Sequence, residues 1–124
     1  MANESELKPL VWMGSSRRDF REFPDEVKSE MGYALFLAQG GGRHRKAKTL
    51  KGAGDAGVVE IGSDYRSDTY RTVYAVRFAS ALYVLHAFQK KSKKGIAMPQ
   101  LELRVIEQRL REAKRIHEES EREG

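Results

Sequence analysis

The sequence predicts an α+β fold, in which an N-terminal helical hairpin packs on a small antiparallel sheet and a C-terminal helix follows. Three observations support this prediction: a helical apolar period before residue 40, runs of β-branched and aromatic residues between residues 58 and 89, and a second helical period after Pro99. The 124 residues are expected to form a single domain. Residues 1–9 are expected to be flexible, and residues 118–124 to be frayed.

The helical hairpin is predicted from two start signals. Ser16 and Asp19 have the spacing of a capping box, so a short helix is expected to begin near Ser16. Pro24, followed by two acidic residues, marks a second start, and the glycines at 40–42 mark its end. Between these signals, five residues recur on one helical face: Val27, Met31, Ala34, Leu35 and Ala38.

The strands are predicted from residue type and alternation. Residues 10–13 form a short apolar run that fits an edge strand. Three further strands, at residues 58–62, 69–78 and 81–89, are expected to form an antiparallel meander. The last helix opens at Pro99 and carries an apolar stripe that ends at His117, which we interpret as a partly covered side chain and not as a ligand.

The charge distribution favours an anionic partner. Lys and Arg outnumber Asp and Glu by 23 to 18, and the excess is concentrated in residues 43–51 and 90–94. Nucleic acid is the first candidate, ahead of an acidic protein or a membrane surface. No membrane partner is expected, because no apolar run approaches the roughly 20 residues of a membrane span and the N-terminus lacks the features of a signal peptide.

Several kinds of chemistry are excluded or disfavoured. The sequence has no cysteine, which excludes disulfides and a thiol nucleophile and fits a reducing cytosol. Residues 52–57 match G-x-G-x-x-G, but they precede a predicted strand instead of opening a helix, so we interpret them as a turn. The three histidines are far apart and lack carboxylates at metal-ligand spacing, so neither a metal nor a cofactor is expected.

The basic residues around the last strand are expected to share one face of the sheet. A hairpin with a two-residue loop would place Arg71 opposite Lys90, and strand alternation would add Val73, Ala75, Arg77, Val84, His86 and Phe88 to the same open face. The opposite face, with Tyr74 and Leu85, is the expected core. Like charges on facing strand positions repel each other, so an anion is expected to lie between Arg71 and Lys90.

Such an open face has the groups that RNA cleavage requires. RNA supplies its own nucleophile, the 2′-hydroxyl. His86 is the candidate general acid or base, and Arg71, Lys90 and Lys91 are candidates for stabilising charge on the phosphate. Phe88 is a candidate for stacking on an unpaired base.

Several segments together resemble a known family: SSRRDFREFPDEVKSEMGYALFLAQGG, LKG, VVEI, DTYRTVYAVRF and YVLHAFQKKSKKGI. Over about residues 11–115, the sequence resembles the phage-related Gp49-like proteins in the HigB branch of the RelE/ParE toxin superfamily. The resemblance implies a RelE-like fold and a cytoplasmic toxin of a type II toxin–antitoxin system. It further implies a metal-independent endoribonuclease that cleaves mRNA on the ribosome, and a cognate antitoxin, often of helix-turn-helix type.

The resemblance also implies roles for individual residues. Arg71 stands where the superfamily often has a catalytic arginine, and His86, Lys90 and Lys91 lie on or next to the last strand, which commonly supplies active-site residues. For Lys51, in the segment LKG, the resemblance implies a contact with RNA. We predict further RNA contacts for Lys48, Arg77, Phe88, Lys93 and Lys94. Several related ribonucleases carry a tyrosine or histidine in the zone that Gln89 and the lysines occupy here, so the proton-transfer roles stay open.

Two other functions remain open from the sequence. One is a ParE-like inhibitor of DNA gyrase, and the other is a non-catalytic, phage-derived nucleic-acid-binding protein. His86 beside several cations favours the ribonuclease over the gyrase inhibitor, because gyrase inhibition requires no group that moves protons.

Overall fold

The computed structural model describes residues 7–53, 57–90 and 98–123, and it has the predicted α+β composition. In chain order the elements are β1 (Leu10–Trp12), α1 (Ser16–Arg21), α2 (Asp25–Gln39), β2 (Lys48–Thr49), β3 (Val58–Tyr65), β4 (Asp68–Ala75), β5 (Leu82–Lys90) and α3 (Gln100–Glu123). The predicted helical hairpin, meander and C-terminal helix are therefore confirmed.

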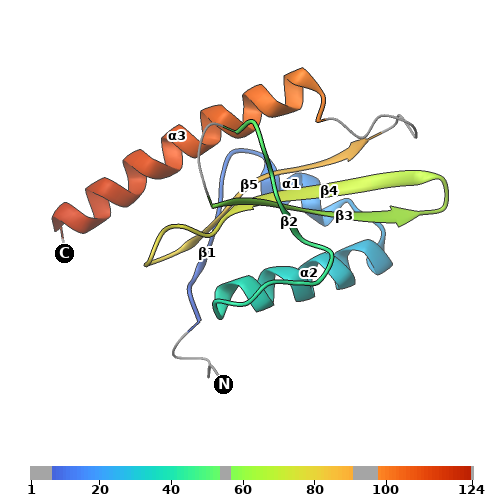
Figure 1. Cartoon of the computed structure of the whole chain (residues 1–124), viewed down its shortest axis with the longest axis horizontal. Coiled ribbons are helices and arrows are strands. Elements are labelled where there is room, and N and C mark those ends of the chain that lie inside the picture. The colour runs from blue at the N-terminus through green and yellow to red at the C-terminus, as the bar shows by residue number, and fades with distance from the viewer. Residues whose placement is uncertain (1–6, 54–56, 91–97, 124) are drawn as a thin grey trace.

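The sheet has five strands in the order β1-β5-β4-β3-β2. Strands β3, β4 and β5 form the predicted antiparallel meander, and β2 adds to its far edge. Strand β1 lies at the other edge, as predicted, but it pairs with β5 in parallel, so the sheet is mixed. The parallel pairing follows from the path of the chain, because α1 and α2 cross between β1 and the meander (Figure 1).

Helices cover both faces of the sheet. Figure 1 shows α1 and α2 on one side and α3 on the other. All five residues predicted for the buried face of α2 are buried there, where they pack on Val59, Ile61, Tyr70 and Tyr74. On the other side Ile106, Leu110 and Ala113 of α3 pack on Val58, Val73, Ala75 and Leu85. The prediction of one open sheet face is wrong, because the apolar stripe of α3 needs a sheet surface to cover it.

The predicted register between β4 and β5 is also wrong. Arg71 lies opposite Phe88, and Lys90 lies opposite Thr69. Residues 76–81 connect the two strands, in place of the expected two-residue loop. A β-bulge further along shifts the pairing, so that Val73 faces His86 and Tyr74 faces Val84 while Leu85 has no partner position. Because of the bulge, the consecutive residues Leu85 and His86 both face α3, whereas Val84 and Ala87 both pack on the α2 side.

The ends of the helices differ in detail from the predictions. Helix α1 starts at Ser16, but its N-cap is Ser15, and the hydroxyl of Ser16 donates to the carbonyl of Val84 instead of forming a capping box. Helix α2 begins directly after Pro24 and ends before Gly40, as predicted. Helix α3 continues through Glu123. The fraying expected for residues 118–124 stays a prediction.

Residues 8 and 9, directly before β1, form hydrogen bonds with the rest of the fold, and the flexibility expected for residues 1–9 stays a prediction. The backbone N–H of Lys8 donates to the carbonyl of Gln39, and the side chain of Gln39 donates back to the carbonyl of Lys8. The carbonyl of Pro9 accepts a hydrogen bond from Leu82. Residues 1–6 lie outside the described part. Within the described ranges, no helix has the length and hydropathy to cross a membrane.

Candidate active site

Three cations from separate strands surround one buried carboxylate on the face of the sheet that α3 partly covers. Lys48 comes from β2, Glu60 from β3, Arg71 from β4 and Lys90 from β5. Nη1 of Arg71 lies 2.6 Å from Oε1 of Glu60, and Nζ of Lys48 lies 3.8 Å from the same oxygen. We call Lys48, Glu60, Arg71 and Lys90 the cationic cluster. Lys48 faces Glu60 directly, and strand alternation puts Arg71 and Lys90 at diagonal positions on the same face of the sheet.

Glu60 explains how the fold holds cations so close together. The sequence predicts an anion between Arg71 and Lys90, and the chain itself supplies one, since the Glu60 side chain is only 5% exposed. A buried carboxylate needs a charged partner, and Arg71 provides it. The signal in the sequence was the single acidic residue in the otherwise apolar segment VVEIG.

The cluster borders a cavity that retains capacity for a further anion. The cavity has a volume of about 400 Å³, and its charged lining residues are the cations Lys46, Lys48 and Arg71 and the carboxylates Glu60 and Asp64. Nε of Arg71 is buried and has no hydrogen-bond partner among the described residues. Gly62 of β3 faces Arg71, and its lack of a side chain leaves space beside Nε of Arg71. A Cβ added at Gly62 would lie 3.9 Å from this nitrogen. The guanidinium can therefore donate one more hydrogen bond.

Lys90 has an unusual protonation equilibrium for a lysine. Its side chain is almost fully buried, and burial lowers its pKa, as do the nearby charges of Arg71 and Lys48, whereas Glu60 raises it. A lysine whose pKa is lowered can exchange a proton more readily near neutral pH. At a pH between the pKa of Lys90 in the folded protein and its pKa in the unfolded chain, the unfolded chain binds more protons. Raising the pH through this range therefore increases the free energy of unfolding.

We expect the pKa of Lys90 to move in opposite directions in two variants. Glu60→Gln removes the charge that raises the pKa, so the pKa falls further; Arg71→Gln removes a charge that lowers it, so the pKa rises. NMR titration of the Lys90 side-chain carbon resonances measures both shifts. Identical titration curves in the wild type and the two variants would contradict the cationic cluster.

His86 belongs to a second network on the same face. Its ring stacks on Phe88 with centroids 4.8 Å apart, and its Nε2 lies 2.6 Å from Oε1 of Glu102. Nη1 of Arg109 lies 3.3 Å from Nδ1 of His86 and also donates to the carbonyl of Leu85. An arginine can only donate, so Nδ1 accepts and the proton of the neutral imidazole lies on Nε2, facing Glu102. Both ring nitrogens therefore have partners within the chain.

Sequence reasoning missed the partners of His86. Glu102 and Arg109 are seven residues apart on α3 and so lie on one helical face, which is the signal that could have identified them. Arg109 also donates to the hydroxyl of Ser15, which in turn donates to Asp19. Burial lowers the pKa of Arg109, but Asp19 and Glu102 partly offset this effect. The network connects α1, β5 and α3 around the imidazole.

Gly14 makes space for Arg109, and its replacement is expected to disturb His86. Gly14 has a φ of +53°, and a Cβ there would lie 2.5 Å from Nε of Arg109. Gly14→Ala should displace the guanidinium and destabilise the fold by about 1–3 kcal/mol, through left-handed backbone strain and lost hydrogen bonds. Denaturant unfolding and the ¹⁵N shifts of the His86 ring measure these effects.

The matched control for this prediction is Gly32→Ala. Gly32 lies within α2, and a Cβ added there would have open space for at least 4 Å around it. This substitution should stabilise the protein by roughly 0.5–1 kcal/mol, because alanine loses less backbone freedom in a helix. If Gly14→Ala left the His86 ring shifts at their wild-type values, the proposed support of His86 by Arg109 would be wrong.

The other predicted site residues are distributed over the surface. Phe88 is buried against His86, so it is not a free stacking surface in this arrangement. Lys51 is exposed on the turn after β2. Arg77 lies beyond the end of β4 that is distant from Arg71, with its guanidinium over Phe78, so it does not join the cluster. Lys91, Lys93 and Lys94 lie outside the described residues.

The sequence predicts that His117 is a packed side chain and that the histidines hold no metal. His117 is largely covered, with its ring against Phe78 and Nδ1 3.2 Å from the hydroxyl of Ser80, which agrees with its interpretation as a packed side chain. Within residues 7–53, 57–90 and 98–123, no group of three or more His, Asp or Glu side chains is arranged to hold a metal ion.

Comparison with known proteins gives one family and two similar structures. The family described as "Phage derived protein Gp49-like (DUF891)" matches residues 18–111. A mutant of the E. coli toxin RelE in the free state is 21% identical with a TM-score of 0.49, covering 65% of this chain and 81% of that one. The toxin–antitoxin complex RelBE2 from Mycobacterium tuberculosis is 17% identical with a TM-score of 0.45, covering 73% of this chain and 100% of that one. No curated protein matches significantly.

Proposed function

Because this chain belongs to the family of phage-derived Gp49-like proteins, we propose that it is the toxin of a type II toxin–antitoxin system. Its activity is that of an endoribonuclease, which cleaves messenger RNA on the ribosome without a metal ion. Its partners are the messenger RNA, the ribosome and a cognate antitoxin, of helix-turn-helix type, and it acts in the cytoplasm.

The cationic cluster is the observation that supports this proposal. Lys46, Lys48 and Arg71 line the cavity of about 400 Å³ together with Glu60 and Asp64, so the cavity wall carries one more positive than negative charge. The buried Nε of Arg71, without a partner among the described residues, is a donor prepared for an anionic oxygen. A phosphodiester fits this arrangement, because preorganised donors act most strongly where negative charge develops in the transition state.

The geometry suggests a division of roles among the side chains. The 2′-hydroxyl of the RNA loses its proton to solvent, and its oxygen attacks the adjacent phosphorus. The bond from phosphorus to the 5′-oxygen of the next nucleotide breaks, which leaves a 2′,3′-cyclic phosphate, and Arg71 and Lys48 stabilise the charge on the non-bridging oxygens. Lys90 donates a proton to the departing 5′-oxygen, since its lowered pKa suits proton transfer better than that of an exposed lysine. His86, whose two nitrogens contact Glu102 and Arg109, shapes the site beside Phe88. Lys51 and the lysines at 91, 93 and 94 contribute contacts with the RNA backbone.

The experiment that tests this proposal is primer extension on messenger RNA after brief induction of the chain in cells. We expect new cuts at codon-phased positions in the wild type, and none with Lys90→Gln, which removes the proposed proton-transfer group. Arg122→Gln is the matched control, because Arg122 is exposed in the last turn of α3, and it should cut as the wild type does.

The same experiment separates the alternatives. Growth arrest with intact messenger RNA, together with inhibition of gyrase supercoiling by the purified protein, would replace the proposal with a ParE-like activity. Salt-dependent RNA binding without cleavage or arrest would indicate a non-catalytic binding protein. Equal cutting by the wild type and Lys90→Gln would leave the ribonuclease in place but remove Lys90 from the chemistry.

A further inference from the structure

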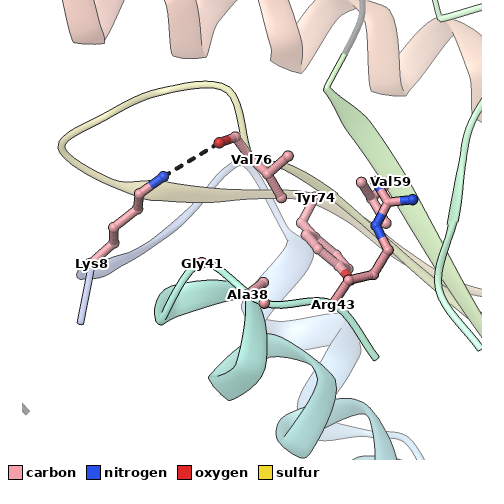
Figure 2. Close-up of a pocket in the computed structure, with 8 residues that line it drawn as sticks. Lys8, Ala38, Gly41, Arg43, Val59, Tyr74 and Val76 are labelled. Atoms are coloured by element: carbon pink, nitrogen blue, oxygen red, sulfur yellow. Dashed lines mark hydrogen bonds between the residues drawn. The ribbon is translucent and has the colours of Figure 1, made fainter. Parts of the chain in front are cut away.

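A second cavity lies on the opposite face of the sheet from the cationic cluster. Its volume is about 420 Å³, and it lies between the C-terminal end of α2 and strands β3 and β4 (Figure 2). Ala38, Val59 and Val76 provide apolar walls, and Lys8, Arg43 and Tyr74 provide the polar groups. Since Val59 and Tyr74 belong to the core beneath α2, this cavity is separated from Arg71 and Lys90 by the sheet itself.

Tyr74 carries a buried hydroxyl that lacks a partner. Its side chain is 1% exposed, and its hydroxyl has no hydrogen-bond partner among the described residues. Burial raises its pKa, whereas the charge of Arg43 lowers it, so the hydroxyl remains protonated and able to donate at neutral pH. A buried hydroxyl without a hydrogen-bond partner is unfavourable for folding. Its position in a cavity wall therefore indicates that a ligand in the cavity could accept its hydrogen bond.

Arg43 stands beside this hydroxyl, and Lys8 lies at the other end of the cavity (Figure 2). Nζ of Lys8 donates to the carbonyls of Phe78 and Val76, and these bonds fix the ammonium group at the cavity (Figure 2). Arg43 extends next to Tyr74 (Figure 2). Within the described ranges, neither Lys8 nor Arg43 forms an ion pair, in contrast to Arg71 in the cationic cluster. The cavity therefore combines a hydroxyl donor, excess positive charge and an apolar wall.

We propose that this cavity binds an organic carboxylate, whose acid group accepts the hydrogen bond of Tyr74 beside Arg43 and whose apolar stem packs on Ala38, Val59 and Val76. A free phosphate fits less well, because most of its oxygens would face the apolar wall. Two sources carry the required chemistry: a small carboxylic acid, and a glutamate side chain of a protein partner. The proposal is independent of the ribonuclease activity, because it involves the other face of the sheet.

The test is an NMR titration of the full-length protein, labelled at its tyrosine ring carbons, with defined probes. Hexanoate represents the free acid, and the capped peptide acetyl-Ala-Glu-Ala-amide represents the side chain. Hexylamine, with the same stem and opposite charge, and inorganic phosphate are the controls. We expect saturable shifts of the Tyr74 signal with at least one of the two carboxylates and none with hexylamine or phosphate. The tighter of the two carboxylates identifies the source.

Two variants assign the binding to named side chains, and isothermal titration calorimetry measures their affinities, because Tyr74→Phe no longer gives a Tyr74 signal. Tyr74→Phe should weaken carboxylate binding about tenfold or more, since the bond lost is one to a charged group. Arg43→Gln should weaken it several-fold. The matched controls are Tyr83→Phe, a buried tyrosine on the α3 side, and Arg45→Gln, an exposed neighbour that does not line the cavity; both should bind as the wild type does.

Thermal unfolding of the free variants keeps the test interpretable. Tyr74→Phe should be at least as stable as the wild type, because it removes a buried hydroxyl that has no partner among the described residues. The proposal is overturned if neither carboxylate shifts the Tyr74 signal, if hexylamine binds as well as hexanoate, or if folded Tyr74→Phe retains wild-type affinity. None of these results bears on messenger RNA cleavage, which the primer-extension experiment measures separately.

Discussion

An Arg71→Gln variant is expected to cleave messenger RNA on the order of 100- to 1000-fold more slowly than the wild type, as when one preorganised donor to a developing anion is removed. The same change should destabilise the fold by about 1–3 kcal/mol, because Glu60 would keep its buried carboxylate but lose the guanidinium 2.6 Å away. The stability cost differs from the sequence-based expectation, in which Arg71 lies on an open face and its removal leaves the fold intact.

A double-mutant cycle with Glu60→Gln separates the two effects. The double variant Glu60→Gln/Arg71→Gln removes both members of the buried ion pair, so it should lose less stability than the two single variants combined. It should nevertheless remain inactive, because the donor to the phosphate is still absent. Denaturant unfolding and primer extension measure the two quantities on the same four proteins. Recovery of cleavage in the double variant would show that Arg71 acts only by balancing Glu60.

The elements of this fold could be predicted because each depends on a local pattern. The face of α2 from Val27 to Ala38 and the stripe of α3 through Ile106 and Leu110 show the period of a helix, and the structure buries both. The arrangement of the layers depends instead on which surface each stripe covers. Periodicity cannot distinguish one side of a sheet from the other, so the position of α3 over the expected open face was not predictable.

The register of β4 and β5 shows a second limit. Two strands that alternate regularly predict a simple hairpin, but the structure inserts a bulge opposite Val73 and Tyr74 and a connection of residues 76–81. Arg71 and Val73 of β4 stay on one face of the sheet, together with His86, Phe88 and Lys90 of β5. The regular alternation of β5 is interrupted only between Val84 and His86. This explains why the sequence correctly placed Arg71, His86, Phe88 and Lys90 on one face while giving them incorrect partners.

The missing members of the candidate site share a physical reason. Glu60, Glu102 and Arg109 compensate or orient other polar groups, and such roles exist only when distant segments meet. Composition reveals an excess of cations, but it does not show that one carboxylate from β3 neutralises part of it. The sequence predicted an open sheet face with a row of cations. In the structure this face carries two networks, one around Glu60 and one around His86.

A Leu85→Asp variant is expected to be unfolded at 25 °C. Leu85 is fully buried in the cluster that joins α3 to the sheet, and the bulge aims it at that cluster. Burying an unpaired carboxylate there should cost more than about 4 kcal/mol, a large part of the stability of a domain of this size. Leu85→Ala, which only creates a cavity, should cost roughly 2–5 kcal/mol and leave a folded protein in the absence of denaturant.

The matched control is the same substitution at an exposed leucine of α3. Leu101 is 74% exposed in the first turn of that helix, where an aspartate is favoured by the helix dipole, so Leu101→Asp should change stability by no more than about 0.5 kcal/mol. Circular dichroism and urea unfolding compare the three variants with the wild type. If Leu85→Asp unfolded at the wild-type urea concentration, α3 would not be packed on Leu85, and the sheet face that carries His86 would be open after all.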